Sequence, residues 1–162
     1  MSATLSASPA SEPGGTSFLR ALFAWSVASL LAAVLAVIVQ TQRIIARLDN
    51  LDAGVTLSER LSMTAYDLVH FGSVYVPIVA VGLLVAFLAG ALVYRLAGFG
   101  RPVVYAVAGG VAMIVILASI KHLTFGVQLV GGAREVPGFV LQVGAGVIGG
   151  LVFARLTRRR AT

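Results

Sequence analysis

Four long apolar runs dominate the sequence and restrict what the chain can fold into. They cover residues 21–39, 74–94, 103–120 and 138–154, and none of them contains a charged residue. A helix needs roughly 20 apolar residues to cross the ~30 Å hydrocarbon core of a bilayer. Lipid offers no hydrogen-bond partner to the backbone, and a helix pairs all of its N–H and C=O groups within one segment. The sequence therefore predicts four transmembrane helices, at about 21–39, 74–94, 103–120 and 138–156.

The composition argues against a water-soluble domain. The chain is 59% hydrophobic and only 11% charged, whereas a soluble domain carries about 25% charged residues. Its outer surface is therefore expected to face lipid. The absence of cysteine excludes thiolate nucleophiles, iron–sulfur clusters and cysteine-based zinc sites. We interpret the net charge of +6 as a topology signal and not as a nucleic-acid-binding signal, and expect no nucleic-acid partner.

Prolines support this segmentation, because they lie at or just before the start of three runs, at Pro77, Pro102 and Pro137. Proline is tolerated there because the N–H groups of the first helical turn have no partner within the helix. We expect a flexible N-terminal tail over residues 1–16, a membrane domain over residues 17–157 and a basic C-terminal tail over residues 158–162.

The longest connection, residues 40–73, carries helical signals of its own. Thr56 and Glu59 have the spacing of a capping box. Apolar residues then fall on one helical face: Leu57, Leu61, Ala65, Leu68 and Val69. We expect an amphipathic helix that lies on the membrane surface or runs into the second span. The predicted fold class is an all-α membrane protein, a four-helix transmembrane bundle with this extra amphipathic helix between spans 1 and 2.

Basic residues predict the orientation of the chain. Four spans place both termini on one side, and an arginine-rich segment follows the fourth run: Arg155, Arg158, Arg159 and Arg160. Positive charge close to a span favours the cytoplasmic side. We therefore expect a multi-pass protein of a bacterial inner membrane with its N and C termini in the cytoplasm.

Small residues predict how the helices pack, because lipid gives apolar side chains no reason to associate and close backbone approach matters more. Alanines recur every four residues in the first run: Ala24, Ala28, Ala32 and Ala36. Predicted packing residues in the second and fourth runs are Gly82, Ala86, Gly90, Gly138, Gly146, Gly150 and Ala154. The contacts they make could lie within the bundle or between copies of the chain.

Under this orientation, polar residues gather at the outer ends of the spans. The third run crosses about 27 Å by Ile120, so Lys121 and His122 reach the outer interface, where a lysine can extend its ammonium group into the headgroups. The outer polar cluster comprises Asp67, His70, Lys121, His122, Arg134, Glu135 and Gln142.

Two chemical uses of this cluster can be stated. Asp67 and His70 are three residues apart and share a helical face, so the carboxylate could orient the imidazole. A metal or haem site through His70 and His122 is a weaker alternative to a hydrated polar surface, and we predict no cofactor or metal. Gln142 is expected to form an interhelical hydrogen bond or to line a cavity.

Two segments carry a resemblance to a known group of proteins. They are 64-TAYDLVHF-71 and 133-AREVPGFVLQVGAGVIGGLVFA-154. Together with the spacing of the spans along residues 20–160, they resemble four-helix inner-membrane proteins of bacteria. The resemblance implies the fold but no activity, cofactor or catalytic residue.

These observations favour a non-enzymatic protein with no catalytic residues. The function we expect is a structural or accessory role, in which the chain packs with itself as a homo-oligomer or with a larger membrane complex. An alternative is a carrier or channel for a small neutral or lipid-like solute, lined by Gln142. The absence of charge within the runs argues against ion-coupled transport.

Overall fold

The computed structural model describes residues 15–51, 54–98, 100–123, 130, 133 and 135–158. Four helices make up the described chain: α1 (Gly15–Asp49), α2 (Leu57–Ala97), α3 (Arg101–Leu123) and α4 (Val136–Leu156). No strand occurs among these residues. The expected all-α class is confirmed, and each of the four helices is long and apolar enough to cross a membrane. Of the tails expected at residues 1–16 and 158–162, residues 1–14 and 159–162 lie outside the described residues, whereas residues 15 and 16 belong to α1.

The helix ends follow local sequence signals. The predicted capping box is present at the start of α2, where the Thr56 side chain accepts the backbone N–H of Glu59 and the Glu59 carboxylate accepts that of Thr56. Gly98 ends the helix with φ of 64°, a left-handed conformation that glycine adopts readily. Pro137 occupies the first turn of α4. The capping bonds satisfy backbone N–H groups that a helix end otherwise leaves unpaired, and proline has no N–H group to satisfy.

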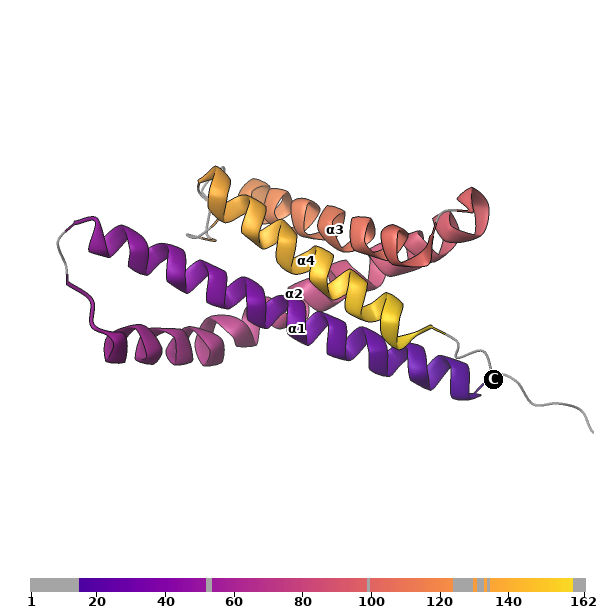
Figure 1. The fold of residues 1–162 in the computed structure, drawn as a ribbon, viewed down its shortest axis with the longest axis horizontal. Coiled ribbons are helices and arrows are strands. Elements are labelled where there is room, and N and C mark those ends of the chain that lie inside the picture. Colours follow the sequence, from indigo (N-terminus) through magenta and orange to yellow (C-terminus); the bar gives the residue numbers. More distant parts are fainter. Residues whose placement is uncertain are drawn as a thin grey trace, which may run out of the picture.

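Two helices are much longer than a bilayer requires. α1 has 35 residues and α2 has 41, which correspond to lengths of about 52 Å and 62 Å. α2 is continuous from Leu57 to Ala97, so the expected amphipathic segment is its first part and not a separate helix. Figure 1 shows the α1–α2 hairpin reaching beyond the adjacent ends of α3 and α4. We call residues 40–51 and 54–73 the outer hairpin.

Neighbouring helices pack in a ring, with α1 against α2 and α4, and α3 also against α2 and α4. The four alanines at four-residue spacing in α1 are fully buried. Large apolar side chains cover much of the outside, as Leu30, Leu88 and Val107 illustrate. Small residues inside and large apolar residues outside are the distribution expected of helices that meet each other in lipid.

The α3–α4 contact is a direct meeting of backbones. A Cβ atom added to Gly146 would overlap the backbone of Gly109, and one added to Gly150 would overlap the carbonyl of Tyr105. Gly149 faces α1, where an added Cβ would lie 2.9 Å from the Cβ of Ala32. Three glycines of α4 therefore allow two neighbouring helices to approach at distances that any side chain would prevent.

The other small residues named from the sequence are buried or partly buried, and two of them lie between α2 and α3. An added Cβ on Gly82 would lie 2.8 Å from Cγ1 of Ile116, and one on Gly90 would lie 3.3 Å from the Cβ of Ala108. Both contacts join α2 to α3. Ala86 is partly buried against the core, while Gly138 and Ala154 are buried in α4.

Candidate functional site

A polar seam joins the two helices of the outer hairpin. The Thr41 hydroxyl donates to Asp67 Oδ2 at 2.6 Å, and Gln42 Nε2 donates to Thr64 Oγ1 at 3.2 Å. Because one member of each pair lies on α1 and the other on α2, these bonds fix the register of the hairpin. The sequence placed Asp67 at this end of the molecule but did not indicate its partner.

Ion pairs extend the seam in two directions. Arg60 of α2 pairs with Asp49 at the end of α1. Glu135, just before α4, contacts Arg43 at 2.7 Å and Arg47 at 3.2 Å. The Glu135 side chain is half exposed, so water screens these pairs and each is worth roughly 0–1 kcal/mol. Their main effect is to tie the start of α4 to the projecting part of α1. Arg134 lies outside the described residues.

The histidines do not form the arrangement considered from the sequence. His70 is exposed, its ring stacks on Tyr66 with centroids 3.9 Å apart, and its Nδ1 lies 3.1 Å from the Tyr66 carbonyl oxygen. Asp67 is instead bonded to Thr41. Lys121 and His122 lie in the last turn of α3 and are exposed. Within the described chain, no three His, Cys, Asp or Glu side chains gather as a metal site requires.

Gln142 is fully buried where α4 meets α1 and α2. Its Nε2 donates to the carbonyl of Ala36 at 3.0 Å, and the Tyr75 hydroxyl lies 3.5 Å from its Oε1. The amide is therefore engaged by other helices on both sides. This geometry is that of an interhelical hydrogen bond, the first of the two uses considered for this residue.

The outer hairpin also presents apolar side chains away from its seam. Three of them, Leu57, Leu61 and Val69, are between 65% and 73% exposed. With the exposed Ala65 they form a row at four-residue spacing along α2, which we call the outer stripe. On a water-exposed surface, apolar rows of this kind commonly mark interaction sites.

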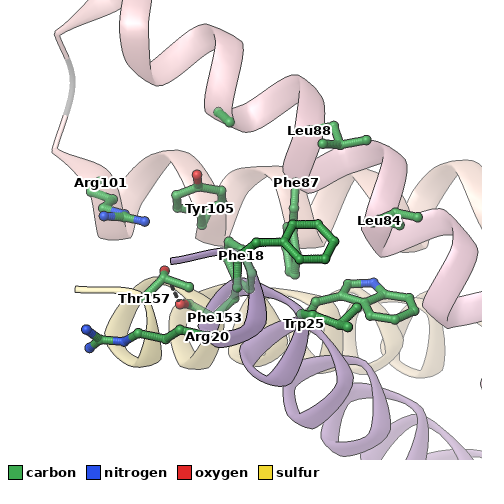
Figure 2. Close-up of a pocket in the computed structure, with 13 residues that line it drawn as sticks. Phe18, Arg20, Trp25, Leu84, Phe87, Leu88, Arg101, Tyr105, Phe153 and Thr157 are labelled. Atoms are coloured by element: carbon green, nitrogen blue, oxygen red, sulfur yellow. Dashed lines mark hydrogen bonds between the residues drawn. The ribbon is translucent and has the colours of Figure 1, made fainter. Parts of the chain in front are cut away.

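A pocket of about 750 Å³ lies at the opposite end of the molecule, where α1 begins and α2 ends. Figure 2 shows Arg20 and Arg101 at one end of this pocket, with Trp25 and Leu84 at the other. Side chains from all four helices line it: Phe18, Arg20, Ala21, Leu22, Trp25, Leu84, Phe87, Leu88, Ala91, Arg101, Tyr105, Phe153 and Thr157. None of these residues was selected as a functional residue from the sequence.

One sequence signal does point to this end of the molecule. Arg20 and Arg101 each lie within two residues of the start of an apolar run, which alone indicates only an interfacial anchor. Their approach to one pocket depends on how far α1 and α2 separate, and that separation is not encoded in any short motif.

Comparison of the chain with protein-family models, with curated proteins and with solved structures gave no match. The four apolar helices are those of a small, multi-pass integral membrane protein. The chemistry of its two ends, the outer hairpin and the pocket, then supplies the observations on which a role can be proposed.

Proposed function

We propose that this protein is a non-enzymatic accessory subunit of a bacterial inner membrane and that it packs against a larger membrane protein through the outer stripe. The observation that carries this proposal is the exposed row of Leu57, Leu61, Ala65 and Val69 on a hairpin that extends past the ends of α3 and α4. The partner we infer is a protein with an apolar helical face outside the hydrocarbon core.

The length of the hairpin favours a protein over the lipid surface as the occupant of the stripe. α1 contains no proline and continues past its apolar run in one direction (Figure 1). The seam through Thr41 and Asp67 holds the first part of α2 alongside it. A helix held in line with a span carries its residues out of the membrane and presents its side chains sideways, whereas an interfacial helix lies in the membrane plane.

The glycines support a partner contact at the hairpin in a second way. Gly146 and Gly150 meet α3, and Gly149 meets α1, so the faces considered from the sequence for self-assembly are occupied within one chain. The outer stripe is apolar and not covered by the described residues. This division leaves the hairpin as the surface on which assembly would depend.

A photocrosslinking amino acid placed at position 61 tests the partner contact in intact membranes. We expect one adduct whose mass corresponds to this chain plus a single larger protein. The same probe at Met63, an exposed apolar residue of the same helix outside the stripe, is the matched control and should give little of that adduct. Adducts of twice the chain mass would show a homo-oligomer, and adducts with lipid alone would contradict the proposal.

Leu61→Glu complements the crosslink, because a carboxylate on the stripe opposes burial against an apolar face. We expect it to abolish co-purification of the crosslinked protein, while Met63→Glu preserves it. The proposed orientation is tested separately with a reporter enzyme, active only outside the cytoplasm, fused after Thr162. Activity of that fusion would contradict cytoplasmic termini.

The carrier alternative relied on Gln142 as a lining residue. The bonds from Gln142 to Ala36 and Tyr75 require that the packed core open before this amide could meet a solute. A lipid-like ligand therefore fits the pocket at the other end of the molecule better than the region around Gln142.

A further inference from the structure

The pocket at the start of α1 opens sideways, toward the region that lipid occupies. Trp25 Nε1 donates to the carbonyl of Ala80 at 3.0 Å, which joins α1 to α2 at the deep end of the pocket. Beyond this bond the two helices diverge (Figure 1). The pocket-lining residues Leu22 and Leu88 lie on opposite sides of this gap and are exposed. A bilayer lipid can therefore reach the pocket without crossing the molecule.

The floor of the pocket is a packed aromatic cluster. Phe87 and Phe153 stack with ring centroids 4.3 Å apart, and Tyr105 meets Phe153 edge-on at 4.9 Å. All three rings are buried and come from α2, α3 and α4. Because the floor is held by three helices, the hollow is preformed, and its volume lies within the ~300–1,000 Å³ range of ordinary ligand pockets.

One end of the pocket is positively charged. The guanidinium of Arg101 lies 5.6 Å from the ring centre of Tyr105, and its Nε is buried without a hydrogen-bond partner among the described residues. Arg20 donates to the carbonyls of Leu156 at 2.9 Å and Arg158 at 2.6 Å, which uses two of its five N–H donors. None of the residues that line the pocket is acidic. This end is complementary to an anion.

The charged and apolar parts of the pocket follow the order of a bilayer. Arg20 directly precedes the first apolar run and Arg101 lies two residues before the third, so both guanidinium groups lie at the level of the headgroups. Trp25 and Leu84 lie further along their runs, at hydrocarbon depth. An occupant therefore needs an anionic group at one end and an apolar chain at the other.

We propose that this pocket is a binding site for one anionic phospholipid of the surrounding bilayer. Its phosphate lies between Arg20 and Arg101, where arginine offers planar, charge-assisted hydrogen bonds. One acyl chain lies along Trp25, Leu84 and Leu88, over the aromatic floor. The bilayer itself supplies this ligand, so no separate solute is required, and the site does not depend on the role proposed for the outer hairpin.

Trp25 makes the proposal directly measurable, because it is the only tryptophan in the chain and lines the pocket. The full-length protein is reconstituted in phosphatidylcholine vesicles that contain phosphatidylglycerol, with bromine on the acyl chains of one lipid or the other. Bromine quenches tryptophan emission on contact. We expect quenching to reveal a preference for phosphatidylglycerol, to which each arginine contributes about fivefold.

Arg101→Gln is the main variant, since its guanidinium makes no hydrogen bond to the described chain that the substitution would remove. We expect its preference for phosphatidylglycerol to fall about fivefold. Arg155→Gln removes the same charge from an exposed position at the same end of the molecule, outside the pocket lining. It is the matched control and should retain the wild-type preference.

Ala91→Phe provides a test that leaves the charge unchanged, because a larger side chain would fill part of the pocket. We expect it to reduce quenching by brominated phosphatidylglycerol, with the helix content by circular dichroism preserved. Equal quenching by the two lipids in the wild-type protein would overturn the proposal. So would a preference that Arg101→Gln leaves intact, or a stronger response to a brominated fatty acid than to phosphatidylglycerol.

Discussion

The α3–α4 pair and the outer part of the α1–α2 pair are held together by different chemistry. Between α3 and α4, Gly109 and Gly146 bring the two backbones into contact with no side chain between them. In the outer hairpin, polar side chains bridge the helices, as Thr41 does to Asp67. The α3–α4 interface depends on positions that have no side chain, whereas the hairpin interface depends on hydrogen bonds between side chains.

The difference corresponds to the two surroundings that the sequence predicts for these regions. In lipid, apolar side chains gain nothing by leaving their solvent, so van der Waals contact between close backbones favours association. In the hairpin seam Thr41 is buried, but Gln42, Thr64 and Asp67 are partly exposed, and the net value of a typical hydrogen bond is about 1 kcal/mol. We therefore expect substitutions between α3 and α4 to affect stability more than substitutions in the hairpin seam.

The largest effect is expected from Gly150→Ala. The added methyl group would overlap the Tyr105 carbonyl, which belongs to backbone and cannot rotate away, so α3 and α4 must separate. Overpacking of this kind costs about 1–3 kcal/mol, and we expect the upper end of that range. The free energy of unfolding, measured by titration from mild detergent into dodecyl sulfate, checks this value.

Gly144→Ala is the matched control for that substitution. It makes the same chemical change in the same helix, but nothing lies within 4 Å of the added Cβ atom. Replacement of a helical glycine by alanine favours the helix by up to about 1 kcal/mol, so we expect this variant to be as stable as the wild type or more so. Equal destabilisation by the two substitutions would remove close approach as the explanation.

The sequence was sufficient to predict the four apolar helices, because a bilayer imposes one requirement, apolar length, that can be read directly. The α3 side of the glycine contact was missed: Gly109 and Gly110 both meet α4, but they are adjacent in the sequence and so form no stripe at four-residue spacing. The continuity of α2 was left open. Pro77 was placed at the start of the second span, but it lies inside α2, about twenty residues after the helix begins at Leu57.

The partners of polar residues could not be predicted for a related reason. Asp67 and His70 share a helical face by spacing, yet Asp67 bonds to α1 and His70 stacks on Tyr66. Spacing within one helix limits which residues are neighbours, but packing against another helix selects among them. The pocket formed by Arg20 and Arg101 depends in the same way on how α1 and α2 diverge.

A smaller effect is expected at Gln142, where a polar bond lies within the apolar core. Gln142→Leu keeps the size of the side chain but removes the donor to Ala36 and leaves the Tyr75 hydroxyl without its amide contact. We expect a loss of about 1–2 kcal/mol, measured by the same titration. Tyr75→Phe should cost less, because the 3.5 Å contact to Gln142 is long for a hydrogen bond.

If Gln142→Leu were more destabilising than Gly150→Ala, the ranking of the two interfaces would be wrong. That result would indicate that one buried amide stabilises the helix arrangement more than the backbone contact between α3 and α4. A double-mutant cycle with Tyr75→Phe would then show how much of the effect passes through the tyrosine.

Where the outer hairpin meets the start of α4, Glu135→Gln is expected to change stability by only about 0.5 kcal/mol. The substitution weakens both contacts, to Arg43 and to Arg47, but all three side chains are partly exposed. Because salt screens exposed charges, the difference from the wild type should shrink between about 0.1 M and 1 M sodium chloride, over which the Debye length falls from about 10 Å to about 3 Å. A difference that is large and independent of salt would contradict the assignment of these pairs to a hydrated region.

The smallest effect on the stability of the whole chain is expected at the start of α2, where the change is local and depends on pH. Glu59 lies well before Val74, where the apolar run of α2 begins, and hydrogen bonds from Thr56 lower the pKa of its carboxyl group. A lowered pKa in the folded state means that the ionised carboxylate stabilises the cap above the usual carboxyl pKa, and that this contribution disappears as pH falls through the lowered value.

Protection of the Thr56 and Glu59 amides from hydrogen exchange should therefore decrease in acid. Thr56→Ala, which removes the cap, should reduce protection about fivefold at neutral pH and should abolish most of the pH dependence. If acid reduced protection equally in the wild type and in Thr56→Ala, another group would control this end of the hairpin.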